Sequence, residues 1–374
     1  MKVKLGDVCE RGSSNLKQSD VVGMSGDYPI YGAAGYLGNV DFYHQEKPYV
    51  AVVKDGAGIG RTTLHPAKSS VIGTMQYLLP KSNILPEYLY YVVSYKHLEK
   101  YFTGATIPHI YFKDYKNEKF NLDSLDMQKK IVDILSKCEG IIKSRNKELE
   151  LLDELVKARF VEMFGDLRKN TKGWKVKKFE EITNLITDGE HTTPKRVENG
   201  IYLLSARNIL NHSIQLEDVD YINQEEYERI TKRVIPQEGD VLISCSGTVG
   251  RCCSVPLGLK FQMVRSVALL RFKKSINPVF AEYMITSDYL QEQINKSKTV
   301  SSQANLFQGK IKTLNGFVPP IELQNQFSDF VKKIDKSKVS LYYKNRKGGF
   351  PPLLFIYSVK TVHTLFSFSF FKSL

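Results

Sequence analysis

The sequence is poor in cysteine, and the cysteines that it has lack the spacing of metal ligands. There are five in 374 residues, Cys252 and Cys253 are adjacent, and no CxxC pair or Cys/His quartet occurs. A zinc site is therefore not expected. The first residues, MKVKLGDV, contain no apolar signal-peptide run. These absences predict a cytoplasmic protein with free thiols.

A phosphate-binding loop is also absent. The Gly-rich stretch Asp55–Arg61, DGAGIGR, has no Lys-Ser/Thr after its glycines and does not have GxGxxG spacing. We interpret it as a turn between a strand and a loop. The loop with Asp188, Glu190 and His191 can suggest acid–base chemistry or a metal. These residues lie too close together in one loop to form such a site unaided, so a ligand-facing or turn-stabilising loop is predicted.

Positive charge is abundant but unevenly distributed. The net charge is +13; residues 1–165 hold 22 Lys/Arg against 20 Asp/Glu, and residues 166–374 hold 31 against 20. Such an excess indicates a polyanionic partner, and nucleic acid before a membrane, because no basic amphipathic helix stands out. The alternative is a globular protein that is merely basic, since 42% hydrophobic and 25% charged residues are typical of soluble domains.

The longest regular pattern is a predicted helix at Asp126–Gly165. Asp123 and Ser124 provide N-cap chemistry, and Gly165 stands where a C-terminal glycine belongs. At 1.5 Å per residue the helix would be about 55–60 Å long. Its apolar or aliphatic-stemmed residues recur in steps of four and three, a heptad pattern that needs a partner helix. They are Ile131, Leu135, Cys138, Ile142, Arg145, Leu149, Leu152, Val156, Arg159 and Met163.

The sequence repeats itself, and the matching segments keep the same order at an offset that grows along the chain. A helix predicted at Leu85–Phe102, with Leu89, Val92, Val93 and Tyr95 available for burial, is one of the repeated segments. The pairs are Val3–Val8 with Val176–Ile182, Gly58–Arg61 with Thr248–Arg251, Leu85–Leu98 with Asn277–Leu290, Ala105–Ile110 with Ser301–Leu306, and Leu125–Leu135 with Ile321–Val331, which sets Gln128 opposite Gln324. We infer a duplicated unit.

Each copy ends in a helix. The second begins after Pro319–Pro320 and has an apolar seam of Leu323, Phe327, Phe330, Ile334 and Leu341. The two helices can pair, antiparallel if a pseudo-dyad relates the copies. A length of roughly 55 Å corresponds to about one and a half DNA turns. The pattern predicts two reading domains held apart by a spacer.

Asp188–Ile209, DGEHTTPKRVENGIYLLSARNI, is the first of several motifs that carry a family resemblance over about residues 1–340. It is similar to the DG-H-TP stretch of the specificity subunits of type I restriction–modification systems. Tyr28–Gly38, YPIYGAAGYLG, resembles the Y-P-x-Y-G-x-x-G opening of another recognition class. Gly239–Arg251, GDVLISCSGTVGR, resembles its G-D-[IV]-L-x-S-x-x-G-x-x-G segment, and PPIELQNQF resembles its P-P-L-E-E-Q entry to a helix.

This resemblance implies an α+β fold with two duplicated α/β target recognition domains, each followed by a long helix, the helices pairing as an antiparallel coiled coil. It implies that the domains read the halves of an interrupted double-stranded DNA site in host defence. Methyltransferase subunits would dock on the helices, and restriction subunits would join through them. The chain would contain no catalytic or metal-binding residue and bind no cofactor, with S-adenosylmethionine, ATP and Mg on the partners. Consistently, no N/D-P-P-Y/F motif and no Gly-rich S-adenosylmethionine loop occurs.

The expected domain boundaries follow the repeat. They are residues 1–125 for the first recognition domain, 126–165 for the central helix, 166–173 for a linker, 174–320 for the second recognition domain, 321–347 for a shortened second helix and 348–374 for a divergent apolar tail. The expected docking face of the central helix consists of Ile131, Leu135, Ile142, Leu149, Leu152, Val156 and Met163.

Candidate DNA-binding residues are donors on loops, because Arg reads guanine and Asn or Gln reads adenine. An ordinary surface role is the alternative for each. Arg61 and Arg251 stand out because they follow equivalent Gly turns, either to contact phosphate or to share a structural role. The candidates in the first copy are Tyr31, Tyr36, Lys54, Arg61, Lys68, Gln76 and His109. Those in the second copy are His191, Thr192, Lys195, Arg196, Arg207, Asn208, Arg251 and Arg265.

The end of the sequence departs from the family pattern. No acidic residue follows Asp335, and glycines and prolines between Gly348 and Pro352 stop any helix. Leu353–Phe371 is apolar but contains Lys360 and His363, a poor match to a membrane span. Two alternative functions remain: a complete restriction or methylation enzyme with similar recognition domains, against which the missing motifs argue, and a silent or truncated specificity subunit, for which the tail is the evidence.

Overall fold

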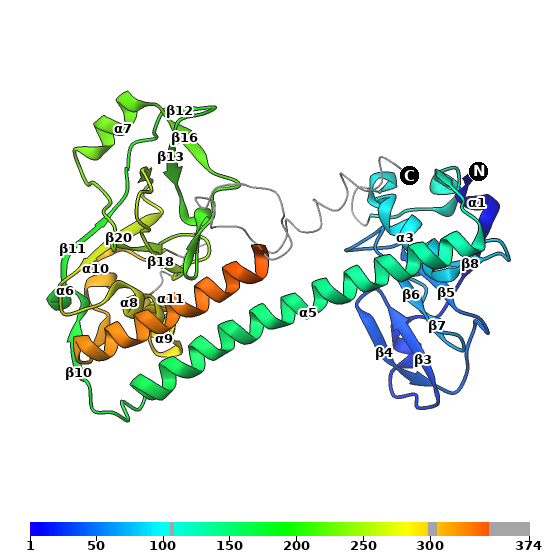
Figure 1. Cartoon of the computed structure of the whole chain (residues 1–374), viewed down its shortest axis with the longest axis horizontal. Helices are drawn as coiled ribbons and strands as arrows, with labels where there is room; N and C mark the ends of the chain where they lie inside the picture. The colour runs from blue at the N-terminus through cyan, green and yellow to red at the C-terminus, as the bar shows by residue number, and fades with distance from the viewer. Residues whose placement is uncertain (105–107, 298–304, 344–374) are drawn as a thin grey trace. The chain divides into compact units, whose positions relative to one another are not determined.

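The computed structural model describes residues 1–104, 108–297 and 305–343 (Figure 1). The chain divides into two compact units. Unit 1 comprises Met1–Lys143, and unit 2 begins at Ser144, so the boundary falls inside one long helix, α5 (Leu125–Phe164). The predicted tail at residues 348–374 and the last residues of the predicted second helix, 344–347, lie outside the described part of the chain.

Unit 1 is organised around an antiparallel sheet with the strand order β2-β8-β5-β6. Strand β5 (Tyr49–Val53) is buried at every position because successive side chains enter two different cores. Val50 and Val52 pack with α3 (Pro86–Tyr95), whereas Tyr49, Ala51 and Val53 pack with a second sheet of order β4-β3-β7. The other elements of this unit are β1 (Lys2–Lys4), α1 (Leu5–Val8), β2 (Cys9–Ser13), α2 (Gln18–Val21), β3 (Tyr28–Gly32), β4 (Gly35–Val40), β6 (Thr62–His65), β7 (Ser70–Val71), β8 (Met75–Pro80), η1 (Leu98–Tyr101), α4 (Phe112–Tyr115) and β9 (Lys119–Asn121).

Unit 2 repeats this plan. Its central sheet has the order β11-β20-β17-β18, and its second sheet contains β16-β13-β19, in which β13 and β19 are parallel as β3 and β7 are in unit 1. The strands are β10 (Lys175–Lys178), β11 (Thr183–Asp188), β12 (Arg196–Val197), β13 (Ile201–Leu204), β14 (Ile209–Leu210), β15 (Ser213–Ile214), β16 (Asp220–Ile222), β17 (Val241–Ser244), β18 (Cys252–Ser254), β19 (Phe261–Met263), β20 (Val267–Phe272) and β21 (Asn315–Val318). The helices after α5 are α6 (Phe179–Ile182), η2 (Ala206–Asn208), α7 (Gln224–Thr231), α8 (Pro278–Thr286), α9 (Asp288–Ser297), α10 (Gln308–Lys312) and α11 (Ile321–Tyr343).

The same strand order in both units gives the predicted duplication a structural basis. The outer pairs match too, since β1 pairs with β9 and β10 pairs with β21, both antiparallel. Unit 2 carries additional elements between its central strands, among them β12 and α7, and these account for the growing offset between the copies. The predicted mixed α/β fold is therefore confirmed.

One predicted helix is shorter than expected. The stretch Leu85–Phe102 is helical only over α3, because His97 adopts a left-handed conformation with φ of 50° and starts a separate 3-10 turn. Leu89 and Val93 are buried as predicted, but Tyr95 is 38% exposed, so its expected burial is wrong. The corresponding stretch of unit 2 divides in the same way into α8 and α9.

Helix α5 runs for 40 residues and ends at Phe164, and the φ of 79° at the next residue, Gly165, suits a C-terminal glycine. Within unit 2, its last turns lie against α11 (Figure 1). Asp153 pairs with Lys338 at 2.5 Å, and the ring of Phe160 lies 5.3 Å from that of Phe327. The residue numbers rise along one helix as they fall along the other, so these segments run antiparallel, as predicted. Knobs-into-holes packing stays a prediction.

The docking face predicted on α5 is only partly free. Val156 is buried in the core of unit 2 and Ile131 packs against the core of unit 1, so neither offers a docking surface. Met163 also packs against the unit 2 core. The remaining predicted residues are half-buried: Leu135, Ile142, Leu149 and Leu152. The buried aromatics of this helix, Phe160 and Phe164, fall outside the predicted seam.

A buried glutamine fastens the start of each long helix to its own unit. Gln128, which is fully buried, accepts a hydrogen bond from Leu85 N at 2.9 Å and donates to Asn83 O and Asp123 O. Gln324 makes the same set, accepting from Asn277 N at 2.8 Å and donating to Ser275 O and Pro319 O. Every polar atom of each side-chain amide is thus bonded to backbone. Gln128 and Gln324, which the sequence repeat aligns with each other, therefore make equivalent hydrogen bonds in the two units.

Unit 1 contains a histidine that should make stability depend on pH. His65 is 6% exposed between Tyr31 and Tyr49, and burial lowers its pKa to about 4. The unfolded chain binds this proton near the ordinary pKa of about 6.5. The contribution of His65 to the free energy of unfolding is therefore fully present above about pH 6.5. It falls by about 3 kcal/mol as the pH drops toward 4.

The measurement is the urea midpoint by circular dichroism at several values between pH 4 and 7. His65→Gln should remove this part of the pH dependence. His97→Gln, at an exposed position, is the control for the loss of an imidazole. An unchanged slope in His65→Gln would contradict the assignment.

Candidate functional site

The turn after β5 in unit 1 and the turn after β17 in unit 2 have the same geometry. Gly60 N donates to the last residue of β5 at 2.8 Å, and Gly250 N donates to the last residue of β17 at 2.9 Å. Both have positive φ, and a Cβ on Gly60 would lie 2.5 Å from Glu99 N, so a side chain is excluded there. Arg61 and Arg251 therefore leave equivalent turns, as the sequence predicted.

A later segment of each copy bonds to the start of this turn. Ile110 N donates to Lys54 O at 2.9 Å in unit 1, and Leu306 N donates to Cys245 O at 2.9 Å in unit 2. A β-bridge adjoins each of these bonds, between Asp55 and His109 and between Ser246 and Asn305. The site in each unit thus combines a Gly turn with the segment that precedes α4 or α10.

In unit 1 the predicted residues gather along one edge. A nitrogen of His109 lies 2.7 Å from the Asp55 carboxylate, and Lys54 lies 3.7 Å from the same group. The guanidinium of Arg61 donates to Ala33 O in the turn between β3 and β4, the hairpin that carries two of the predicted tyrosines. The residues brought together are Tyr31, Tyr36, Lys54, Arg61 and His109.

In unit 2 the carboxylate of Asp188 connects three segments. It accepts hydrogen bonds from Arg233 after α7 and from Gln308 at the start of α10, each at 2.5 Å. The ring of His191 lies 3.0 Å from its other oxygen. The loop that begins at Asp188 is therefore fixed in position by elements distant in sequence.

Glu190 in the same loop is held ionised. Burial raises its pKa, but hydrogen bonds from Thr192 and the charges of Arg229 and Arg233 outweigh this and keep the pKa below its ordinary value. Arg265 N donates to Glu190 O at 3.0 Å. A carboxylate in this environment is a poor proton donor near neutral pH, so the loop is arranged for positioning.

Two predicted arginines share a carboxylate on the second sheet of unit 2. Arg196 donates to Asp220 at 2.9 Å and Arg207 donates to the same residue at 3.0 Å. Burial raises the pKa of Asp220, but the hydrogen bond from Arg196 and both positive charges lower it below its ordinary value. Each guanidinium is about half exposed, which leaves donors free to meet an outside acceptor.

The structure contradicts the prediction for Gln76 and Asn208. Gln76 is 6% exposed and donates to Gly12 O, and Asn208 is 1% exposed with its amide bonded to backbone on both sides. Both side chains are used inside the fold, so neither is available to read a base. Lys68 is exposed but follows β6, at the opposite end of that strand from Arg61, and Lys195 is exposed before β12.

Several residues of these surfaces were not predicted. Asp188 acts as a connecting carboxylate. Arg229, near the end of α7, and Arg233, just after it, are four residues apart, a spacing that the sequence displays. Tyr111 and Phe307 are exposed beside the Gly turns. In the sequence, Tyr111 and Phe307 could have been noticed as large aromatic residues at positions that normally hold a helix-capping residue.

The thiols of the units are structural. Cys9, Cys245, Cys252 and Cys253 are buried, and burial raises the pKa of Cys9 and of Cys245 to about 12. Thiols in such surroundings are inert nucleophiles. Within residues 1–104, 108–297 and 305–343, no group of three or more His, Cys, Asp or Glu side chains is arranged to hold a metal ion. Across the same ranges no helix is both apolar enough and long enough to span a bilayer.

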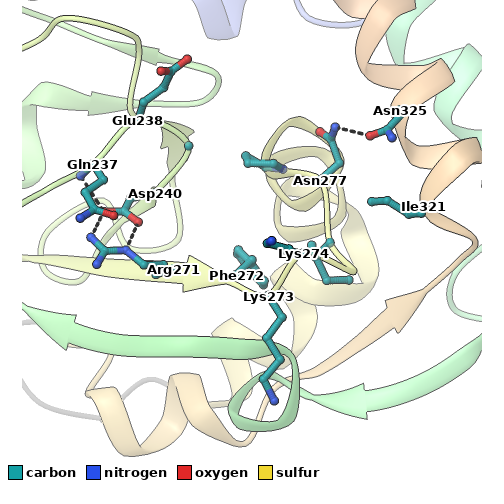
Figure 2. A pocket seen from close by; sticks show the side chains of 13 residues that line it. Gln237, Glu238, Asp240, Arg271, Phe272, Lys273, Lys274, Asn277, Ile321 and Asn325 are labelled. Atoms are coloured by element: carbon teal, nitrogen blue, oxygen red, sulfur yellow. Dashed lines mark hydrogen bonds and ion pairs between the residues drawn. The ribbon is translucent and has the colours of Figure 1, made fainter.

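A polar hollow of about 380 Å³ lies at the other end of the unit 2 sheet (Figure 2). The register puts Ser244 opposite Val267 at the end with the Gly turn, whereas the hollow is lined by residues around Asp240 and Phe272. Arg271 fills part of it with a bidentate ion pair to Asp240, at 2.8 and 2.7 Å. This hollow lies where the central sheet of unit 2 meets α8 and α11.

Comparison with known proteins assigns the family. The model of the type I restriction modification DNA specificity domain matches residues 1–151 and 171–346. The chain belongs to this family. The type I specificity subunit predicted from the motifs is thereby confirmed.

Individual relatives agree with this assignment. The chain is 23% identical over 310 residues to the type I restriction enzyme MjaVIII specificity subunit of Methanocaldococcus jannaschii, which covers 76% of this chain and 72% of the relative. It is 25% identical over 168 residues to the MjaIX specificity subunit of the same organism, 39% of each chain. The crystal structure of a type I restriction–modification S subunit from M. genitalium superimposes with a TM-score of 0.59 at 14% identity, over 92% of this chain and 91% of that one, and shares the fold.

Proposed function

We propose that each unit of this specificity subunit reads one half of an interrupted site in double-stranded DNA. The observation that carries the proposal is that the two units share the same Gly turn with its arginine but differ in the loops near it. Both units present an arginine after the same Gly turn. In unit 1 this arginine bonds to the β3–β4 hairpin, whereas in unit 2 the segment that bonds to the turn leads to Gln308, which donates to Asp188. A common scaffold with different loops suits two different half-sites.

The central helix supports the proposed spacing of the halves. At 1.5 Å per residue, the 40 residues of α5 extend about 60 Å. Successive major-groove sites on one side of DNA are roughly 34–36 Å apart. We propose that α5 fixes the number of unread base pairs between the half-sites.

We further propose that methyltransferase subunits dock along α5 and that restriction subunits join through them. Ile134 and Ile141 support such docking, because they are seven residues apart and 50% and 54% exposed. S-adenosylmethionine, ATP and Mg are expected on those partners, with no cofactor and no catalytic residue in this chain. The complex would act in the cytoplasm, where its DNA is.

The test is methylome sequencing of cells that express this chain with its cognate methyltransferase. We expect one two-part motif with a fixed gap, methylated in both halves. Cells with the methyltransferase alone are the control. A complex that assembles but leaves no motif would contradict the proposal. Methyl transfer by the purified chain alone would instead support the enzyme alternative.

Arg61 and Arg251 provide a sharper prediction. If each contacts a phosphate, then Arg61→Gln and Arg251→Gln weaken binding to all sequences alike and lower the salt-dependence slope by about one each. Fluorescence anisotropy across a salt series measures this with the assembled complex. Lys333→Gln, exposed on α11, is the control. A loss confined to one base pair would mean direct readout instead.

A further inference from the structure

Two exposed aromatic side chains occupy equivalent places in the two units. Tyr111 is 49% exposed just before α4, and Phe307 is 59% exposed just before α10. Each directly follows the residue whose N–H bonds to the Gly turn, Ile110 in unit 1 and Leu306 in unit 2. Tyr111 and Phe307 therefore each lie one residue along the chain from the bond to the turn that carries Arg61 or Arg251.

Neither ring caps the helix that it precedes. The N-cap position favours Ser, Thr, Asp or Asn, whose side-chain oxygen accepts a hydrogen bond from the first turn. Tyr111 and Phe307 occupy this position without any side-chain cap. Both units thus place an exposed aromatic side chain at the same position of the repeat.

The surroundings of the rings are those of a polyanion surface. Lys113 Nζ lies 5.4 Å from the centre of the Tyr111 ring, and the ring of His109 stacks beside it. In unit 2, Gln308 follows Phe307 and donates to Asp188, which joins this ring to the His191 loop. Exposed Lys310 and Lys312 follow on α10. Lysines beside the rings suit phosphates, and an exposed apolar ring suits the deoxyribose of the backbone.

We propose that Tyr111 and Phe307 are equivalent DNA-contacting residues whose rings pack on the nucleic acid and add affinity without base specificity. The inference rests on the DNA-reading function proposed above. Every nucleotide of a duplex presents the same deoxyribose and phosphate, so packing of a ring on the backbone tolerates any sequence. An aromatic residue at the same position in both units suits a contact that both half-sites share. The loops that differ between the units remain free to read different bases.

The test uses Tyr111→Ser and Phe307→Ser in the complex with methyltransferase subunits. Serine supplies the missing cap, so folding should be retained and the melting temperature equal or higher. The probes are a duplex with the motif found by methylome sequencing and a duplex with both half-sites scrambled. We expect each variant to bind both about tenfold more weakly, with their affinity ratio unchanged. Tyr111→Phe and Phe307→Tyr keep a ring and should bind as the wild type does.

Leu257→Ser is the matched control, because Leu257 is 78% exposed beyond β18, at the end of the sheet away from the Gly turn. Unchanged affinity in both serine variants would overturn the inference, as would a loss confined to one base pair. Loss of the methyltransferase subunits with normal DNA binding would identify a protein contact and also overturn it. If the wild-type complex bound neither duplex, the proposed function itself would fail.

Discussion

Replacing Gln324 with leucine should destabilise unit 2 by about 3–5 kcal/mol. The substitution leaves Asn277 N and the carbonyls of Ser275 and Pro319 without the partners they have now, in a fully buried place. Each buried polar group left unpaired costs about 1–3 kcal/mol. Urea unfolding followed by the fluorescence of Trp174 measures this, because the only tryptophan packs against the unit 2 core.

Gln326→Leu is the matched control, since the same change at an exposed position two residues away should shift stability by less than about 0.5 kcal/mol. Gln128→Leu should have an equally large effect on unit 1, seen by hydrogen exchange. If Gln324→Leu unfolded at the same urea concentration as Gln326→Leu, the anchoring role of these amides would be refuted.

Phe327→Ala should also cost unit 2 about 3–5 kcal/mol, the usual range for removing a buried phenylalanine ring. Phe327 is fully buried, and its ring meets Phe160 at 5.3 Å, Phe164 at 5.6 Å and Tyr283 at 5.1 Å. Removal of this ring would leave a cavity between α11 and the end of α5 and remove the packing that joins them. The Trp174 signal should be especially sensitive, because its Nε1 donates to Phe164 O at 2.8 Å.

Val161→Ala on the facing helix α5 is the control, because Val161 is 56% exposed and its truncation removes little buried surface. A double-mutant cycle between Phe327→Ala and Phe160→Ala should show coupling, since the rings are in contact. Strictly additive losses would mean that the two helices are held together elsewhere.

The large-scale organisation could be predicted because it leaves periodic and repeated signals. The heptad steps of α5, the order of the repeated segments and the opposition of Gln128 and Gln324 all appear in the sequence itself. These signals depend on local spacing. The heptad steps correspond to one uninterrupted helix, the repeated segments to a strand order shared by both units, and the two glutamines to a shared set of hydrogen bonds.

Side-chain roles in the site were harder to predict, because they depend on contacts between distant segments. Asn208 has the chemistry of an adenine reader, yet its amide is consumed by Ser205, Gln215 and Asp218. Asp188 seemed part of a local cluster, but its partners Arg233 and Gln308 come from far along the chain. Residue type identifies a donor or an acceptor, whereas only the fold determines whether it is already occupied.

The burial of the cysteines gives this protein a natural labelling site. Cys9, Cys245, Cys252 and Cys253 are enclosed, whereas Cys138 is only half-buried and lies on α5. Maleimide reagents attack accessible thiolates, so the native sequence directs a fluorophore to the part of α5 that belongs to unit 1. A single dye there, with an acceptor dye on either end of a DNA duplex, would report the orientation of the helix along DNA without any engineered cysteine.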